Sequence, residues 1–220
     1  MFLKQKYSNQ PKSGLGMISS IVQQKEVIFL EFDDLVKMRR SIHYFTDEAV
    51  SNQDVYYILE AARWAPSAGN NQPWRFIIVR DPKTIERIWE TTTGIEVPIS
   101  SRRSITVTPQ NFIKKAPVII IVCTDTQAYK GKQNSIYSDR FCVQDSAIAT
   151  MNLLLAAANR GLGACWVGMY REDALSEVIK LPSTIRPMAI IPLGHTTSKE
   201  KPRPRKPLEE LIHYESYGLN

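Results

Sequence analysis

The sequence predicts a single α+β domain, and three observations support that prediction. Short runs rich in β-branched residues, typical of strands, alternate with stretches whose apolar residues recur at helical spacing. Hydrophobic residues make up 43% of the 220 residues and charged residues 23%, close to globular averages, which excludes general disorder. Neither an internal repeat nor a low-complexity linker divides the chain.

The domain is expected to begin at residue 32. Residues 1–24 are polar, without a clear period, which is typical of a loosely held extension. We therefore predict that residues 1–31 form a loosely ordered N-terminal extension and that residues 32–220 form the domain. Phe32, Leu35 and Val36 have the i, i+3, i+4 spacing of a short amphipathic helix that ends near Arg39–Arg40.

A second helix is predicted between Ser51 and Pro66. Ser51 is a favourable N-cap residue, and Asp54 stands three residues later in the capping-box position. An apolar stripe follows, and Pro66 ends the helix. The stripe consists of Val55, Ile58, Leu59 and Ala62.

Two strands with a helix between them are expected next. Residues 75–80 (RFIIVR) predict a buried strand, and Asp81-Pro82 opens a helix that buries Ile85, Ile88 and Trp89. Residues 117–123 (PVIIIVC) are continuous and β-branched, which predicts the central strand. The segments 91–113 and 124–140 are predicted to be loops.

The second half of the chain is expected to contain one long buried helix and several short elements. Residues 141–160 carry apolar side chains on nearly all sides, which predicts a central helix with Gly161 as its left-handed cap. Strands are expected at residues 164–168 and 187–194, with helices at 172–180 and 207–214.

Charge and cysteine content narrow the class of protein. Lys and Arg number 28 and Asp and Glu 22, so the net charge is +6, a surplus suited to nucleic acid, an anionic membrane or a phosphorylated small molecule. Three cysteines lack CxxC spacing and three histidines are scattered, so we expect no disulfide framework, no metal site and a reducing, cytoplasmic location.

The longest apolar run, residues 116–123, is far shorter than the ~20 residues that span a bilayer, so no membrane partner is predicted. No nucleophile elbow, Walker loop or G-x-G-x-x-G motif occurs, and we assign no catalytic side chain.

Three segments carry side chains suited to binding. Arg39-Arg40-Ser41 is suited to clamping a phosphate, although cations at a helix end also simply offset the helix dipole. Residues 66–74 (PSAGNNQPW) hold three amides, which match the C=O and N–H groups on the edge of a heteroaromatic ring, or else satisfy their own backbone. In residues 199–206 (KEKPRPRK) prolines keep the chain extended, so that Arg203 and Arg205 point to one side as an anion clamp. The alternative for this segment is a solvated basic tail or a nucleic-acid contact.

In this order the segments resemble the nitroreductase family of flavin enzymes, over about residues 35–217. The matching pieces are residues 39–42 (RRSI), residues 61–67 (AARWAPS) continuing to Asn70, Gln72, Pro73 and Trp74, residues 161–168 (GLGACWVG), and Arg203, Arg205 and residues 207–210 (PLEE).

The resemblance implies a three-layer sandwich, with a mostly antiparallel sheet flanked by helices, that works as an intertwined homodimer with one FMN per subunit at the interface. It also implies a set of cofactor contacts, some supplied by the partner subunit. The FMN phosphate would be held by Arg39, Ser41, Arg203 and Arg205, with Arg40 beside them. The edge of the flavin ring would be met by Pro66, Ser67, Asn70 and Gln72. The flavin N5 would be approached by the backbone of Trp166, Val167 and Gly168.

His43 departs from the family pattern. The family usually has Arg or Lys two residues after the serine, close to the flavin N1 and O2, where this chain has His43. Because histidine changes charge near neutral pH, we hypothesise that the potential of the bound flavin is lower and more pH-dependent than in relatives.

The activity implied by the resemblance is an FMN-dependent oxidoreductase. It takes hydride from NAD(P)H and passes electrons to a nitroaromatic, a quinone or a similar small acceptor in a ping-pong scheme, with the loops 91–113 and 124–140 shaping the acceptor pocket. One alternative keeps FMN but changes the reaction, to reductive dehalogenation or to fragmentation of the flavin. Another is a non-enzymatic nucleic-acid binder through residues 199–206; no aromatic residue interleaves that segment, so no nucleic-acid partner is predicted.

Overall fold

The computed structural model describes residues 31–100, 103–131 and 135–218. The extension predicted for residues 1–31 therefore lies, apart from its last residue, outside the described residues.

A four-stranded antiparallel sheet forms the centre of the domain. Its strand order is β1 (Trp74–Val79), β4 (Val118–Asp125), β6 (Ile185–Gly194) and β5 (Gly163–Ala164). Each neighbouring pair is antiparallel. The predicted central strand is confirmed, because every residue of β4 from Val118 to Thr124 is buried. The prediction of a buried first strand is only partly right: β1 lies at the sheet edge, and only Trp74 and Val79 at its two ends are buried.

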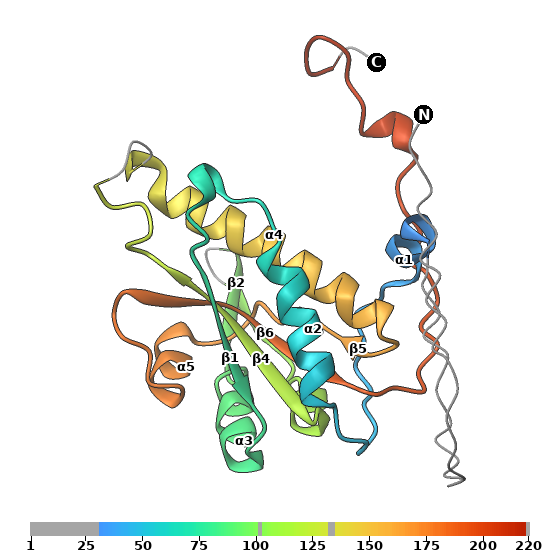
Figure 1. The fold of residues 1–220 in the computed structure, drawn as a ribbon, viewed down its shortest axis with the longest axis vertical. Coiled ribbons are helices and arrows are strands. Elements are labelled where there is room, and N and C mark those ends of the chain that lie inside the picture. The colour runs from blue at the N-terminus through green and yellow to red at the C-terminus, as the bar shows by residue number, and fades with distance from the viewer. Residues whose placement is uncertain (1–30, 101–102, 132–134, 219–220) are drawn as a thin grey trace, which may run out of the picture.

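Helices cover both faces of this sheet, which gives the expected three layers (Figure 1). Helices α2 (Asn52–Arg63) and α4 (Ser138–Asn159) pack on one face, where Ile120 and Val122 of β4 point. Helices α3 (Pro82–Glu90) and α5 (Glu172–Val178) pack on the other, against Ile119 and Ile121. Alternation of side chains along one buried strand thus supplies both halves of the core.

The predicted helix ends are confirmed at atomic detail. The Asp54 backbone N–H donates to Ser51 Oγ at 3.0 Å, and the Thr84 N–H donates to Asp81 Oδ2 at 2.9 Å. Gly161 follows α4 with a φ of 69°, the left-handed conformation that favours glycine.

The segments predicted as loops contain more structure than expected. Within residues 91–113, β2 (Glu96–Ser100) pairs antiparallel with β3 (Arg103–Thr106), and a 3₁₀ helix begins at Asn111 (Asn111–Lys115). The prediction failed because Thr, Ser and Pro dilute the apolar alternation of a two-stranded ribbon. Within residues 124–140, β4 continues to Asp125, a 3₁₀ turn forms at Ser135–Tyr137, and Tyr129 is completely buried.

The predicted last helix is wrong. Only a 3₁₀ turn forms there (Leu208–Glu210), although Leu208, Leu211 and Tyr214 have helical spacing. All three side chains are exposed in the described chain, so no burial of apolar surface there offsets the entropy cost of ordering a longer helix.

The first helix, α1 (Phe32–Met38), forms as predicted but likewise buries no residue. Figure 1 shows α1 and the segment after β6 standing together at one side of the sheet, with the C-terminal end extending away from the domain. By length and composition alone, α4 could cross a membrane, but the core helices of soluble proteins meet the same two criteria. Half of the most apolar 18-residue stretch of α4 is buried inside the protein.

Candidate functional site

A pocket of about 360 Å³ brings together side chains from distant parts of the sequence. We call it the cationic pocket. It is lined by Arg39, Arg40, Ser41, His43, Gln110, Cys165, Trp166, Glu200, Lys201, Arg203 and Arg205. The structure thus places the end of α1, the segment after β5 and the proline-rich segment after β6 around one cavity.

Strand β5 positions the first of these segments. The Ile42 N–H donates to the Ala164 carbonyl oxygen at 3.0 Å, and Ser41 forms a parallel bridge with Ala164. Gly163 makes the approach possible, because a Cβ there would lie only 2.8 Å from Ile42 Cγ2. The arginines just before Ile42 are therefore fixed relative to Trp166, which follows β5.

The charge of the cationic pocket suits an anion. Arg39, Arg40, Lys201, Arg203 and Arg205 line it with one carboxylate, that of Glu200. Among the described residues, none of these five cations forms an ion pair with a carboxylate, and the buried Nε atoms of Arg39 and Arg40 lack a hydrogen-bond partner. Buried donors are normally satisfied, so these two are suited to an anionic acceptor, and guanidinium groups bind phosphate and carboxylate groups with bidentate, charge-assisted hydrogen bonds.

His43 is held by two neighbours. Its ring stacks on Phe112 with centroids 4.4 Å apart, and its Nε2 lies 3.4 Å from Cys165 Sγ. Burial raises the pKa of Cys165, while the hydrogen bond with Ser41 and the charge of Arg39 act in the opposite direction. Because the thiol stays protonated at neutral pH, Cys165 is a neutral hydrogen-bonding neighbour of the imidazole rather than a nucleophile.

The segment 166–168 lies partly in the cationic pocket. Trp166 lines it, whereas Val167 is buried and exchanges backbone hydrogen bonds with Ile190 at 2.9 and 3.0 Å. Gly168 is exposed, and a Cβ there would meet only Trp166 at 3.5 Å. Packing within the described chain therefore does not require glycine at this position.

The structure does not bring residues 67–72, the amide loop, into the cationic pocket. Pro66 and Asn70 are exposed and Ser67 is half-buried. Gln72 lines a separate hollow of about 560 Å³ between α2 and β1. Gly69, Asn70 and Gln72 all have left-handed φ angles, of 57°, 55° and 49°. Such conformations in residues other than glycine persist only where the surroundings impose them, and they are concentrated at functional sites.

Sequence reasoning missed four residues that line the cationic pocket. Glu200 and Lys201 belong to the basic segment already singled out, and Cys165 precedes Trp166, so their neighbours gave a usable signal. Gln110 gave none, because it stands in a polar segment without motif or period.

Comparison with known proteins places the chain in a family. Residues 36–195 match the model of the nitroreductase family. A protein of Methanothermobacter thermautotrophicus named as an NADH dehydrogenase/NAD(P)H nitroreductase is 35% identical over 84% of this chain and 86% of its own length. An iodotyrosine deiodinase of Thermotoga neapolitana is 31% identical over 81% of this chain and 94% of its own length.

A solved structure shares the fold as well as the sequence. A Desulfovibrio desulfuricans protein described as a nitroreductase and crystallised in complex with FMN superposes with a TM-score of 0.66 at 31% identity, covering 84% of this chain and 96% of that one. With the match to the family model over most of the domain, these relationships establish that the chain is a member of the nitroreductase family.

Proposed function

We propose that this protein is an FMN-dependent oxidoreductase that uses NAD(P)H to reduce a small oxidised acceptor such as a nitroaromatic or a quinone. The observation that carries the proposal is the cationic pocket, in which three segments far apart in sequence present five cations and two unpartnered buried donors. The relatives named as NAD(P)H nitroreductase and the FMN complex of a family member support the same assignment.

The residues of the cationic pocket fit the phosphate of FMN. Arg39 and Arg40 offer buried Nε–H donors, Ser41 offers a hydroxyl, and the exposed Arg203 and Arg205 close the pocket from the other side. When bound, FMN supplies the redox chemistry, hydride uptake from NAD(P)H followed by electron transfer to the acceptor. The protein contributes binding, orientation and charge.

A homodimer accounts for the position of the amide loop. Within one chain the amide loop and the cationic pocket line different cavities. The helix α1 and residues 208–217 expose large apolar side chains, among them Phe32, Met38, Leu211 and Tyr217, the last of which is 92% exposed. Apolar surface of this extent is typical of an interaction site. A second copy that covered it would bring contacts to the flavin that one chain cannot make.

The test combines a spectrum with turnover. We expect the purified protein to show flavin absorption near stoichiometric occupancy, or to take up added FMN. Under argon it should oxidise NADH or NADPH beyond one equivalent per flavin only when a nitroaromatic or quinone is present. Light scattering should give the mass of a dimer. A colourless protein that refuses FMN would refute the proposed function, whereas a strict monomer that binds FMN fully would refute the homodimer.

Reductive dehalogenation is a second candidate, because the deiodinase of Thermotoga neapolitana is 31% identical over most of both chains. Iodotyrosine and a nitroaromatic, offered separately to the reduced protein under argon, separate the two reactions. Iodide release faster than nitro reduction would favour the dehalogenase. The nucleic-acid alternative loses support, because Arg203 and Arg205 line the cationic pocket together with Arg39 and Arg40.

A further inference from the structure

The amide loop is held at its start by a buried hydrogen-bond pair. The Ala68 N–H donates to Asp145 Oδ2 at 3.2 Å, and the Tyr129 hydroxyl donates to the same oxygen. Asp145, on α4, is 4% exposed, and Tyr129 is completely buried. Burial raises the pKa of Tyr129, and the neighbouring carboxylate of Asp145 raises it further, so the phenol remains a donor at neutral pH.

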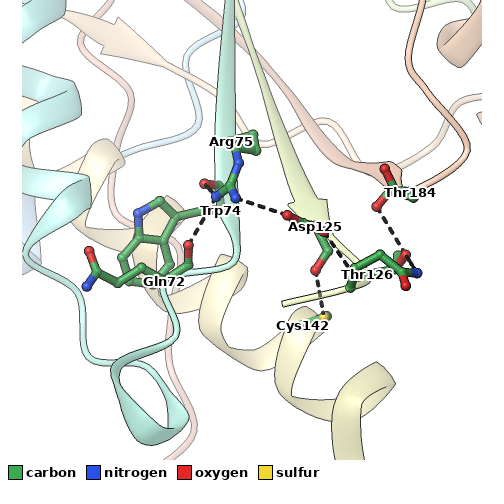
Figure 2. Close-up of polar contacts among 8 residues, drawn as sticks. Gln72, Trp74, Arg75, Asp125, Thr126, Cys142 and Thr184 are labelled. Carbon is green, nitrogen blue, oxygen red and sulfur yellow. Dashed lines mark hydrogen bonds and ion pairs between the residues drawn. The ribbon is translucent and has the colours of Figure 1, made fainter. Parts of the chain in front are cut away.

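An ion pair holds the end of the amide loop. The Arg75 guanidinium donates to the carbonyl oxygens of Gln72 at 3.2 Å and of Trp74 at 2.8 Å, and it donates to Asp125 Oδ2 at 3.0 Å. Figure 2 shows the Arg75 side chain between Gln72 and Asp125. The Asp125 N–H also donates to the Pro73 carbonyl oxygen at 2.8 Å, so the end of β4 fixes the residues that follow the loop.

The loop between these two attachments needs such support. Three of its residues have left-handed φ angles, and two of the three, Asn70 and Gln72, are not glycine. Its internal hydrogen bonds are all local. The Gln72 N–H donates to Ser67 Oγ at 3.0 Å, and Gln72 Nε2 donates to Asn70 Oδ1 at 3.1 Å. The Asn70 N–H donates to the Ser67 carbonyl oxygen at 2.9 Å, and the Asn71 N–H and Nδ2 donate to that of Ala68 at 3.3 and 2.8 Å. Strained backbone of this kind keeps one conformation only while the surrounding structure imposes it.

We propose that the Tyr129–Asp145 pair and the Arg75–Asp125 pair are positioning residues that hold the amide loop ordered before the flavin ring arrives. The inference rests on the proposed function, since it assumes that the amide loop meets the ring edge. Neither pair touches the flavin in this scheme. An ordered loop pays less conformational entropy on binding, so the two pairs strengthen ring binding without contributing a contact.

The principal variant is Tyr129→Phe, which removes one hydroxyl and keeps the ring in the core. Flavin titration of the apoprotein should show Kd values for FMN and for riboflavin raised by the same factor, on the order of tenfold, about the contribution of one hydrogen bond to a charged group. Asp145→Asn should act in the same direction. The matched control is Tyr57→Phe on α2. The Tyr57 hydroxyl accepts a hydrogen bond from Asn159 Nδ2 at 2.9 Å, away from the amide loop, so both Kd values should stay unchanged in this variant.

Arg75→Met tests the other attachment. Because the Arg75 side chain is 50% exposed, we expect a smaller effect, about two- to fivefold in both Kd values. Its control is Arg186→Met, which breaks an ion pair of similar exposure with Glu172, on α5 at the other face of the sheet.

Amide hydrogen exchange of the apoprotein gives a readout that needs no flavin. Residues 68, 70, 71 and 72 all donate backbone hydrogen bonds, so their exchange reports the order of the loop. We expect Tyr129→Phe to accelerate exchange at these residues by about tenfold relative to the buried strand β4. Unchanged exchange there in a folded variant, or a loss of affinity confined to FMN, would overturn the inference. A wild-type protein that binds no flavin would refute the proposed function instead, and exchange would still decide the role of Tyr129.

Discussion

Removal of the Arg39 guanidinium tests the assignment of the cationic pocket to a phosphate. The Arg39 side chain is half-buried, its Nε has no partner among the described residues, and the next residues are fixed by the bond from Ile42 to β5. Arg39→Ala should therefore leave the pocket in place and remove one preformed donor. FMN binding should weaken because a charge-assisted hydrogen bond to the phosphate is lost.

The size of the effect follows from burial. A hydrogen bond that involves charged groups contributes about 1.5–3 kcal/mol, which corresponds to roughly a 10- to 150-fold rise in the Kd for FMN. Arg203 is exposed in the described chain, so water screens its charge more strongly. For Arg203→Ala we expect about 1 kcal/mol or less, up to about a fivefold change. Both variants should therefore raise the Kd for FMN, and Arg39→Ala should raise it more than Arg203→Ala.

The assay compares two flavins that differ only in the phosphate. The apoprotein is titrated with FMN and with riboflavin, and binding is followed by quenching of flavin fluorescence. Arg39→Ala should weaken FMN binding and leave riboflavin binding unchanged. Arg186→Ala, which removes a cation paired with Glu172 outside the pocket, should change neither. Higher ionic strength should reduce the advantage of FMN over riboflavin in the wild type more than in Arg39→Ala.

One result would refute this reasoning. If Arg39→Ala weakened FMN and riboflavin by the same factor, the guanidinium would not face the phosphate, and the loss would have to come from a displaced pocket. Equal affinity of the wild type for both flavins would lead to the same conclusion.

Four further predictions follow from the geometry. Gly163→Ala should cost about 1–3 kcal/mol of unfolding free energy and weaken FMN binding, because the new Cβ would displace Ile42 and the arginines before it; urea unfolding and flavin titration measure the two effects. Ser51→Ala should cost about 1 kcal/mol and lower the Tm by about 2–4 °C in calorimetry, with unchanged flavin affinity, because it removes only the cap of α2. The pKa of Tyr129 is raised in the folded protein, so the Tyr129 hydroxyl stabilises the fold fully below the unfolded-state pKa of about 10. This contribution is lost as the pH rises above about 10, so the difference in unfolding free energy between wild type and Tyr129→Phe, measured in urea titrations, should shrink there. His43→Arg should raise the potential of the bound flavin and flatten its dependence on pH between about 5.5 and 8.5, and an unchanged profile in spectroelectrochemical titration would contradict that role of His43.

The elements that could be predicted from the sequence are those determined by local chemistry. The capping residues Ser51 and Asp81 act within one helical turn, and β4 is apolar along its length because helices cover both its faces. The ribbon of β2 and β3 escaped prediction because its short strands carry few apolar residues. Tyr129 escaped because its burial depends on Asp145, 16 residues away in the sequence.

In the candidate site, the proposed ligand-binding residues could be predicted from the sequence, whereas the residues that support them could not. The arginines of the cationic pocket were identified from two short motifs, residues 39–41 and 199–206, and a family resemblance, and the structure brings those two motifs together but leaves the amide loop apart. Their roles toward the flavin stay predictions. The supporting residues were not identified: Cys165 beside His43 and Arg75 beside Gln72 act through single contacts that leave no periodic or motif signal. Residues that bind a shared ligand form recognisable motifs, whereas residues that position them depend on the three-dimensional neighbourhood.

The failed helix prediction at residues 207–214 bears on the assembly. The spacing of Leu208, Leu211 and Tyr214 is that of one helix face, yet a single chain forms only a 3₁₀ turn there and leaves all three exposed. Amphipathic helices of this length are marginal alone and form when their apolar face is covered. The proposed dimer would explain this mismatch between pattern and conformation, since a second copy could cover the exposed face, which lies directly after Arg203 and Arg205. If dimer formation orders this segment, FMN affinity should rise with protein concentration through the range in which the dimer forms.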